Sequence, residues 1–407
     1  MAKAEGLGVW LDGVRIAELT ARRGDSIACR YTGEALERWP QNSPVISCSL
    51  PLSSRRQQAL AFCKGLLPEG NALQTLADRA GLATNDTFGL LERYGRDVAG
   101  ALVISAGDPD ERRFGVEPYT TKTLEAAIED LDDHPLGSGD DSELSLAGLQ
   151  DKLLLIDLGK GRWGRPIHGR PSTHILKVDD PRRAGLVDAE ADCLQLARAA
   201  GLTSIDIKRK RLGDSSCLIV SRFDRLEQPD GIRRIHQEDL CQALAVDPDA
   251  HNRRAKYEAA DGPRFKQAAK LLDEYSQSPA DELDRLISIV TFTVLIGNAD
   301  AHGKNLALLH PDSESVQIAP LYDTVPTALW PKLRTTAAMS IGGQVTLSDV
   351  TLEDVYRESL LWRHPVERAE ATALATIDSI TAALESDVIP PDSQVAKFVR
   401  KRIEKLG

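Results

Sequence analysis

One stretch of nine residues, GNADAHGKN at 297–305, constrains the fold of this chain more than any other segment. It follows the apolar run Leu286–Ile296 and precedes a second apolar run, Leu306–Leu309. The two runs predict a buried helix and a buried strand, with a dense group of polar side chains between them. Polar residues have no packing purpose at such a position. The segment therefore predicts a functional loop that is held between two core elements.

Asp300, Asn305 and Asp323 are candidates for phosphoryl-transfer chemistry. Asn305 lies five residues after Asp300, and Asp323 ends a short apolar segment, APLYD, 23 residues after Asp300. Phosphoryl transfer needs a carboxylate near the attacking hydroxyl and hard oxygen ligands for Mg²⁺. Protein kinases supply an Asp, an Asn five residues later, and a second Asp beyond a short pair of strands. The spacing in this chain matches that pattern.

The kinase order His-Arg-Asp is not kept, because His302 follows Asp300 instead of preceding it. A turn rich in Asp and Asn, whose side chains cap buried backbone groups, is the alternative interpretation of the segment.

Lys177 lies next to the end of a predicted strand, Thr173–Val178, and could contact the phosphates of a nucleotide. A strand lysine can reach the α- and β-phosphates, and a carboxylate on a neighbouring helix can orient it. Glu190 lies in the predicted helix Leu186–Ala200 and could be that carboxylate. A surface lysine with no such role is the alternative for Lys177.

Two other segments could approach a nucleotide. The turn SLAGLQDK, residues 145–152, contains Ala147 and Gly148, whose small side chains would let backbone N–H groups come close to phosphate. It is neither a Walker loop nor a GxGxxG loop, and an ordinary turn is the alternative. The segment Ser221–Arg225 follows an apolar strand, at the position where kinases join their two lobes beside adenine. A salt-bridged turn at a strand end is the alternative there.

The composition divides the chain into three parts, 1–105, 106–235 and 236–407. In the first part, alternating stretches such as Gly8–Leu11 and Pro44–Ser47 predict a small antiparallel sheet. Helical spacing of apolar residues then predicts helices between 54 and 95, with a break at LPEG, residues 67–70.

The second part contains an exposed acidic loop, 131–143, which is followed by strands at Leu153–Ile156, Thr173–Val178 and Cys217–Val220 around the helix 186–200. This order is compatible with a small nucleotide-binding lobe. The third part is mostly helical except near 305–323.

The composition limits the class of protein. The net charge of -11 argues against a chain that coats nucleic acid, which needs clustered Lys and Arg. The basic stretch Lys397–Lys405 predicts a solvated terminal helix, with a DNA contact as the alternative. Six dispersed cysteines contain no CxxC pair, so a reducing compartment is expected. The N-terminus has no signal-peptide pattern and the longest apolar run is too short for a membrane span, so we expect a cytoplasmic protein.

Taken together, the chain resembles the HipA-type serine/threonine kinases, which are toxins of bacterial toxin–antitoxin pairs. The resemblance covers nearly the whole chain and rests on segments in a fixed order. In the first part these are GLLPEGNALQTLA and FGLLERYGRDVAGAL. The later ones are SLAGLQDK, THILK, SRFDR, HQEDLCQAL, GNADAHGKN and APLYD. The resemblance implies an α+β, two-lobed protein-kinase-like fold with a small N-terminal β/α module (1–105), a nucleotide-binding lobe (106–235) and a mostly helical C-terminal lobe (236–407).

The resemblance also implies roles for individual residues. Asp300 would be the catalytic base, Asn305 and Asp323 would hold Mg²⁺, and Ser145 would be an autophosphorylation site. Phosphate on Ser145 would repel nucleotide and inactivate the enzyme, because it adds about -1.5 to -2 charges. Glu190 would support Lys177. The set expected to contact ATP comprises Ala147, Gly148, Gln150, Lys152, Lys177, Ser221, Phe223, His302, Lys304 and Asp323.

Family members phosphorylate a protein such as an aminoacyl-tRNA synthetase, which stalls translation and makes cells dormant. The resemblance therefore implies a small helix-turn-helix antitoxin of the HipB type as partner, with operator DNA bound only through the complex.

Two positions depart from the family pattern: Lys256-Tyr257 is not followed by Gly-Gly-Pro, and Leu306 replaces a common aromatic residue. A small-molecule kinase and a non-catalytic pseudokinase are the competing hypotheses. The N-terminal module argues against the first, and the intact Lys177, Asp300, Asn305 and Asp323 argue against the second.

Overall fold

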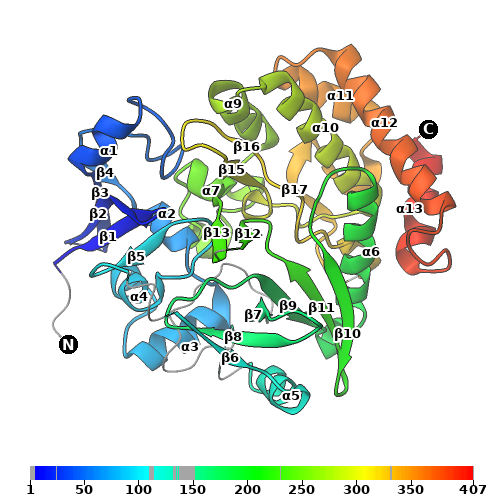
Figure 1. Ribbon diagram of the computed structural model, residues 1–407. Helices are drawn as coiled ribbons and strands as arrows, with labels where there is room; N and C mark the ends of the chain where they lie inside the picture. The colour runs from blue at the N-terminus through cyan, green and yellow to red at the C-terminus, as the bar shows by residue number, and fades with distance from the viewer. Residues whose placement is uncertain are drawn as a thin grey trace.

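A computed structural model of the chain describes residues 5–23, 25–109, 114–131, 134, 136, 152–229, 231–330 and 332–406. These residues form a small N-terminal module, a lobe built on a six-stranded sheet, and a larger lobe that is mostly helical (Figure 1). The predicted α+β class with two lobes is confirmed.

The N-terminal module is a five-stranded antiparallel sheet with helices packed on it. Its strand order is β4-β3-β2-β1-β5, and its core is a separate hydrophobic cluster. The break at 67–70 falls between two helices, as predicted. The elements are β1 (Leu7–Leu11), β2 (Val14–Arg22), β3 (Ser26–Tyr31), α1 (Gly33–Arg38), β4 (Gln57–Gln58), α2 (Leu60–Gly65), α3 (Gly70–Ala80), α4 (Thr87–Tyr94) and β5 (Val103–Ser105).

The strand predicted at Pro44–Ser47 is wrong. Val45 and Ile46 are buried, which explains the apolar signal, but the segment is an irregular loop. Its backbone groups bond to side chains instead of to a neighbouring strand. The N–H of Ile46 donates to the Tyr31 hydroxyl at 3.3 Å, and its carbonyl contacts Nε2 of His236 at 2.7 Å.

The second sheet has the order β10-β11-β9-β7-β8-β6 and carries α5 and α6. Strands β7 and β9 pair antiparallel, so that Lys152 lies directly opposite Lys177. Directly opposed residues project to the same face of a sheet, which brings these two lysines together. The elements are β6 (Gly115–Pro118), α5 (Thr121–Glu129), β7 (Lys152–Asp157), β8 (Trp163–Ile167), β9 (His174–Val178), α6 (Leu186–Ala199), β10 (Ile207–Leu212) and β11 (Ser215–Ser221).

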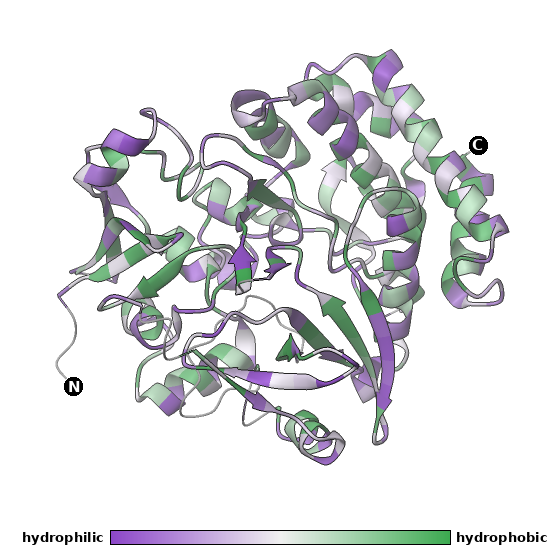
Figure 2. Cartoon of the chain, in the orientation of Figure 1, coloured by the Kyte–Doolittle hydropathy of each residue, from purple (hydrophilic) through white to green (hydrophobic). Residues whose placement is uncertain are grey.

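The strands at 153–156, 173–178 and 217–220 and the helix at 186–200 are confirmed within one or two residues. Strand β10 was not predicted, because four consecutive residues, 208–211, are basic and exposed and give no apolar alternation. It lies at the edge of the sheet and is hydrophilic along most of its length (Figure 2). Of the acidic loop 131–143, only residues 131, 134 and 136 are described.

The C-terminal lobe is built around α10 (Pro279–Ile296), which packs against α9, α11, α12 and α13. The predicted buried helix at 286–296 and the terminal helix over 397–405 are confirmed. The hairpin β17–β18 was not predicted. Beyond α10, the elements from residue 225 onward are β12 (Arg225–Gln228), β13 (Gly231–Arg234), β14 (His236–Asp239), α7 (Leu240–Ala243), α8 (Ala250–Arg253), α9 (Phe265–Tyr275), β15 (Ala307–His310), β16 (Gln317–Ile318), β17 (Thr336–Ile341), β18 (Gln344–Thr346), α11 (Leu352–Leu361), α12 (Val366–Glu385) and α13 (Gln394–Leu406).

None of the helices in the described part of the chain combines the length and apolar character needed to cross a membrane.

Candidate active site

A cleft of about 950 Å³ lies where the second sheet, the helical lobe and the N-terminal module meet. This volume is at the upper end of the range for sites that bury a small ligand. One wall of the cleft is apolar, and the other carries charged groups. The charged residues on that wall include Glu69, Lys152, Lys177, Glu190, Lys256, Asp300, Lys304 and Asp323.

The segment 297–305 forms a tight loop at the floor of this cleft. Helix α10 ends at Gly297, which adopts the left-handed conformation with φ 69°. A Cβ there would lie 2.7 Å from the ring of Phe398, so the turn requires glycine. The Asn298 side chain accepts from the N–H of Asp300 at 3.0 Å, and the Asn305 amide donates to the Asp300 carbonyl at 3.0 Å. These hydrogen bonds are those of an Asx-rich turn, and they hold the candidate functional loop in one conformation.

The Asp300 carboxylate points into the cleft and is held by one hydrogen bond. The hydroxyl of Tyr257 donates to Oδ1 at 2.9 Å. Burial raises the pKa of Asp300, the Tyr257 hydrogen bond opposes that rise, and the charge of Asp323 adds to it. The Arg334 guanidinium stacks on the Tyr257 ring, 4.4 Å from its centroid. Oδ1 of Asp300 is thus oriented by Tyr257. Within the described residues Oδ2 has no hydrogen-bond partner, so it can accept a proton.

Lys177 joins two carboxylates from different parts of the chain. Its Nζ lies 2.6 Å from Oε1 of Glu190 on α6 and 2.8 Å from Oδ1 of Asp323. Burial lowers the pKa of Lys177, but Asp323 and Glu190 outweigh it and raise the pKa overall. Asp323 shows the converse: burial raises its pKa, while the Lys177 charge and hydrogen bond hold it at about 2. Lys177 and Asp323 are therefore both charged at neutral pH.

Asn305 and Asp323 each carry an oxygen atom of the kind that binds a magnesium ion. The Asn305 amide nitrogen is used on the Asp300 carbonyl, which leaves its oxygen as an acceptor. Only Oδ1 of Asp323 is bonded to Lys177, and 38% of that side chain is exposed. Carboxylate and amide oxygens are the ligands that Mg²⁺ prefers. Asp323 has φ 51°, a left-handed conformation that is uncommon outside glycine and that often occurs at functional sites.

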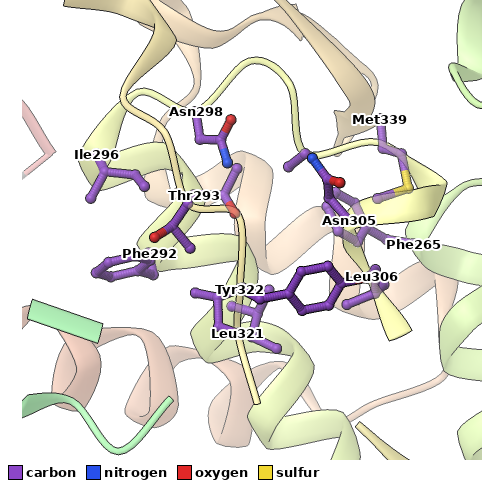
Figure 3. A pocket seen from close by; sticks show the side chains of 13 residues that line it. Phe265, Phe292, Thr293, Ile296, Asn298, Asn305, Leu306, Leu321, Tyr322 and Met339 are labelled. Carbon is purple, nitrogen blue, oxygen red and sulfur yellow. The ribbon is translucent and has the colours of Figure 1, made fainter. Parts of the chain in front are cut away.

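A small cavity of about 10 Å³ lies next to the loop 297–305, and Asn305 is one of the residues that line it. Figure 3 shows Asn305 beside Phe265, Leu306 and Met339, with the Tyr322 ring crossing below. The Tyr322 hydroxyl donates to the Lys304 carbonyl at 2.7 Å. These contacts fix the backbone on which Asn305 stands.

Three further predicted residues, Lys152, His302 and Lys304, line the same cleft. Burial, followed by the charge of Lys177, lowers the pKa of Lys152 to about 8. Burial lowers the pKa of His302 to about 3, so this ring is neutral. Burial also lowers the pKa of Lys304, but Asp239 and Glu69 raise it to about 12.

The segment Ser221–Arg225 lies at the apolar end of the cleft. The Ser221 N–H is already bonded to the Asp206 carbonyl at 2.8 Å, so Ser221 can offer a base only its carbonyl. The Phe223 N–H has no backbone partner among the residues described, and the Phe223 ring packs on Tyr322 at 5.4 Å. Ile175 and Val220 complete this wall. The Ser221 carbonyl and the Phe223 N–H lie two residues apart in this segment, and an acceptor and a donor at that spacing suit the edge of adenine.

The same segment is also a salt-bridged turn, which was the alternative interpretation. Asp97 of the N-terminal module accepts from Arg225 at 2.9 Å and lies 3.8 Å from Arg222. Arg222 and Arg225 both pair with Asp224, at 2.8 and 3.0 Å. All four side chains are at most 2% exposed. This buried ionic cluster connects the module to the segment between the lobes.

Four predicted site residues, Ser145, Ala147, Gly148 and Gln150, lie outside the described residues. The structure brings together the other predicted residues in one cleft. Our sequence interpretation did not include Glu69, Tyr257, Lys256 or Arg334. Glu69 lies in the GLLPEGN segment, which we used only to establish resemblance, and Lys256-Tyr257 was noted only for its departure from the family pattern.

Two family models and several known proteins match this chain over most of its length. The family model described as the HipA-like C-terminal domain matches residues 144–388, and the HipA N-terminal domain matches residues 7–105. A candidate kinase of Sinorhizobium fredii, Y4mE, is 37% identical over 96% of this chain and 95% of its own length. The serine/threonine-protein kinase toxin HipA of Shewanella oneidensis is 28% identical over 84% of this chain and 79% of its own length.

A solved structure has the same fold. It contains the Shewanella oneidensis toxin–antitoxin system HipA, HipB and its operator DNA, and its matching chain has a TM-score of 0.80 and 25% identity. The match covers 98% of this chain and 95% of that chain, so it includes the N-terminal module and both lobes of a kinase-like fold. The chain therefore belongs to the HipA family of toxin kinases.

Proposed function

We propose that this chain is an ATP-dependent serine/threonine-protein kinase that acts as the toxin of a toxin–antitoxin pair. The observation that carries the proposal is the ion-paired Lys177, bonded to Glu190 and Asp323 in the cleft that also holds Asp300 and Asn305. In a kinase, this lysine contacts the α- and β-phosphates of ATP and the helix carboxylate orients it. The apolar wall at Ser221 and Phe223 would receive adenine.

The remaining residues would act on the two substrates. Asp300 would accept the proton of the attacking hydroxyl, with its carboxylate oriented by Tyr257. Asn305 and Asp323 would hold Mg²⁺, which when bound neutralises charge on the phosphates. Lys152, His302 and Lys304 would contact the phosphates from the floor of the cleft. The loop 145–152, with Ala147, Gly148 and Gln150, would cover them.

The partners follow from the family. The related structure contains HipA with HipB and operator DNA, which supports a HipB-like helix-turn-helix antitoxin as the partner of this chain and DNA binding through that complex. The net charge of -11 fits a toxin that relies on its partner for DNA affinity. Phosphorylation of a protein such as an aminoacyl-tRNA synthetase would inhibit translation and arrest growth. Autophosphorylation at Ser145 would inactivate the toxin.

Incubation of the purified protein with Mg-ATP, followed by mapping of phosphate by mass spectrometry, tests the proposal. We expect phosphate on Ser145 and its loss in Ser145→Ala. The matched control is Ser142→Ala, three residues earlier in the sequence, which should still be phosphorylated on Ser145. A wild-type protein that neither takes up phosphate nor binds ATP would contradict the kinase proposal.

Tyr257→Phe removes the hydroxyl that orients Asp300 without changing the packing of the ring. We expect the rate constant of phosphoryl transfer at saturating ATP to fall by about tenfold, because a hydrogen bond to a charged group contributes about 1.5–3 kcal/mol. Tyr119→Phe, on a tyrosine that does not line the cleft, should leave the rate unchanged. Equal rates in Tyr257→Phe and wild type would show that Asp300 needs no such orientation.

A further inference from the structure

Glu69 is a residue of the N-terminal module whose carboxylate lies in the cleft of the kinase site. It occupies the N-cap position of α3, but its side chain makes no capping hydrogen bond there. Ser, Thr, Asp and Asn are the residues favoured at an N-cap because their short side chains reach the backbone. Gly70 follows with φ 63°, a conformation that favours glycine. The Glu69 side chain therefore does not cap its own helix, and its carboxylate is left to bind groups elsewhere in the protein.

The partners of Glu69 are two lysines of the C-terminal lobe. Oε2 of Glu69 lies 3.0 Å from Nζ of Lys256, and Oε1 lies 3.6 Å from Nζ of Lys304. The three side chains are between 4% and 9% exposed. A charge buried to this degree requires a partner of opposite sign. Burial raises the pKa of Glu69, but the charges of Lys304 and Lys256 outweigh it and lower the pKa overall.

Both lysines belong to the segments that carry the catalytic groups. Lys256 precedes Tyr257, whose hydroxyl orients Asp300, and its carbonyl accepts from the N–H of Gly303 at 3.1 Å. Lys304 lies in the catalytic loop, immediately before Asn305. Its Nζ has no hydrogen-bond partner within the described part of the chain, although Asp239 lies 3.4 Å away. The Lys304 ammonium group is therefore held at the cleft between two carboxylates, those of Glu69 and Asp239.

We propose that Glu69 is a positioning residue of the kinase site, which holds Lys256 and Lys304 at the cleft and so makes the N-terminal module part of the phosphate-binding machinery. The inference rests on the proposed kinase function and adds a residue from outside both lobes. The Glu69 carboxylate performs two functions with opposite effects on ATP. It fixes the segment that orients Asp300, which favours transfer, and it neutralises two lysines that line the cleft, which weakens the attraction of phosphate.

Glu69→Gln separates these effects, because it keeps the shape of the side chain and removes its charge. We expect the dissociation constant for ATP to fall by at least about threefold, since two cleft lysines lose a counter-charge within 4 Å. We expect the rate constant of self-phosphorylation at saturating ATP to fall by at least about tenfold, since the Lys256–Tyr257 segment loses a contact. ATP binding is measured by calorimetry with Mg-ATP in the Asp300→Asn background, where turnover does not interfere.

Lys64→Met is the matched control. Lys64 also joins the N-terminal module to the C-terminal lobe, through Asp247 at 2.8 Å and Asp249 at 3.4 Å, but it does not line the cleft. A purely structural role for Glu69 predicts that the two variants lose stability and activity in the same manner, with no gain in ATP affinity. Glu69→Asp, which keeps the charge on a shorter side chain, should retain the wild-type affinity for ATP.

Three outcomes decide the inference. Tighter ATP binding together with slower transfer in Glu69→Gln supports it. ATP binding in Glu69→Gln that is equal to or weaker than in Lys64→Met overturns it while leaving the kinase proposal intact. If Glu69→Gln does not fold, Glu69→Asp carries the test, and weaker ATP binding with unchanged transfer in that variant overturns the inference. An inactive wild-type protein that binds no ATP would instead contradict the kinase proposal itself.

Discussion

Asp300→Asn is expected to lower the rate constant of phosphoryl transfer by about 10²- to 10⁴-fold, the contribution of a positioned general base. The amide keeps the size of the side chain and its contact with Tyr257 but cannot accept the substrate proton. ATP binding should change little, because the adenine wall and Lys177 are untouched. The measurement is a time course of phosphate transfer from labelled ATP at saturating nucleotide.

The same variant should be at least as stable as the wild type. Burial raises the pKa of Asp300 above its ordinary value, which means that the folded protein disfavours the charged form. Replacement by the neutral amide removes the cost of burying this charge at neutral pH. Residues at functional sites often lower the stability of the folded protein in this way. Asp261→Asn is the control, since Asp261 is exposed and has φ 59°, a conformation that Asn also tolerates. A fully active Asp300→Asn protein would refute the assignment of the base.

Asp97→Asn is expected to destabilise the protein by about 3–5 kcal/mol, the cost of removing one partner from a buried ion pair. The Asp97 carboxylate is 0% exposed and faces Arg222 and Arg225, and it also accepts from the N–H and hydroxyl of Ser172 at 3.0 and 2.8 Å. Its loss leaves two buried guanidinium groups that, within the described residues, pair only with Asp224. The free energy of unfolding, measured by urea denaturation, is the test.

An exposed ion pair provides the control for this prediction. Asp206→Asn breaks a pair with Arg198 in which the two side chains are 67% and 55% exposed, and such pairs contribute at most about 1 kcal/mol. A destabilisation by Asp97→Asn no larger than that by Asp206→Asn would show that the buried cluster does not hold the module in place.

The pH dependence of stability should change in the same variant. Burial raises the pKa of Asp97, but Arg225, Arg222 and Arg234 outweigh it and hold the pKa below its usual value. A carboxyl group whose pKa is lower in the folded state stabilises the protein above the unfolded-state pKa of about 3.9, and this stabilisation is lost as the pH falls through the folded-state value. We therefore expect the acid-induced loss of stability below pH about 4 to be smaller in Asp97→Asn than in the wild type.

Much of the kinase core could be predicted from sequence because its signals are local. The apolar run before Gly297, the strand that carries Lys177 and the helix that carries Glu190 each have a clear hydrophobic pattern, and the structure confirms all three elements. The loop at Pro44–Ser47 shows the limit of this reasoning. Burial of Val45 and Ile46 produces an apolar signal that is the same for a strand and for a loop with side-chain hydrogen bonds.

The residue pattern was enough to predict the elements and the types of residue that phosphoryl transfer needs, because periodicity and spacing act within a few residues along the chain. The pairing of the buried charges, in contrast, depends on tertiary packing. Glu69 and Lys256 are 187 positions apart, and Asp97 and Arg225 are 128 positions apart. Nothing in the local pattern of either residue indicates its partner. The free-energy cost of burying a charge is offset only where an opposite charge lies beside it. These opposite charges come together only when the module and the lobes pack against each other.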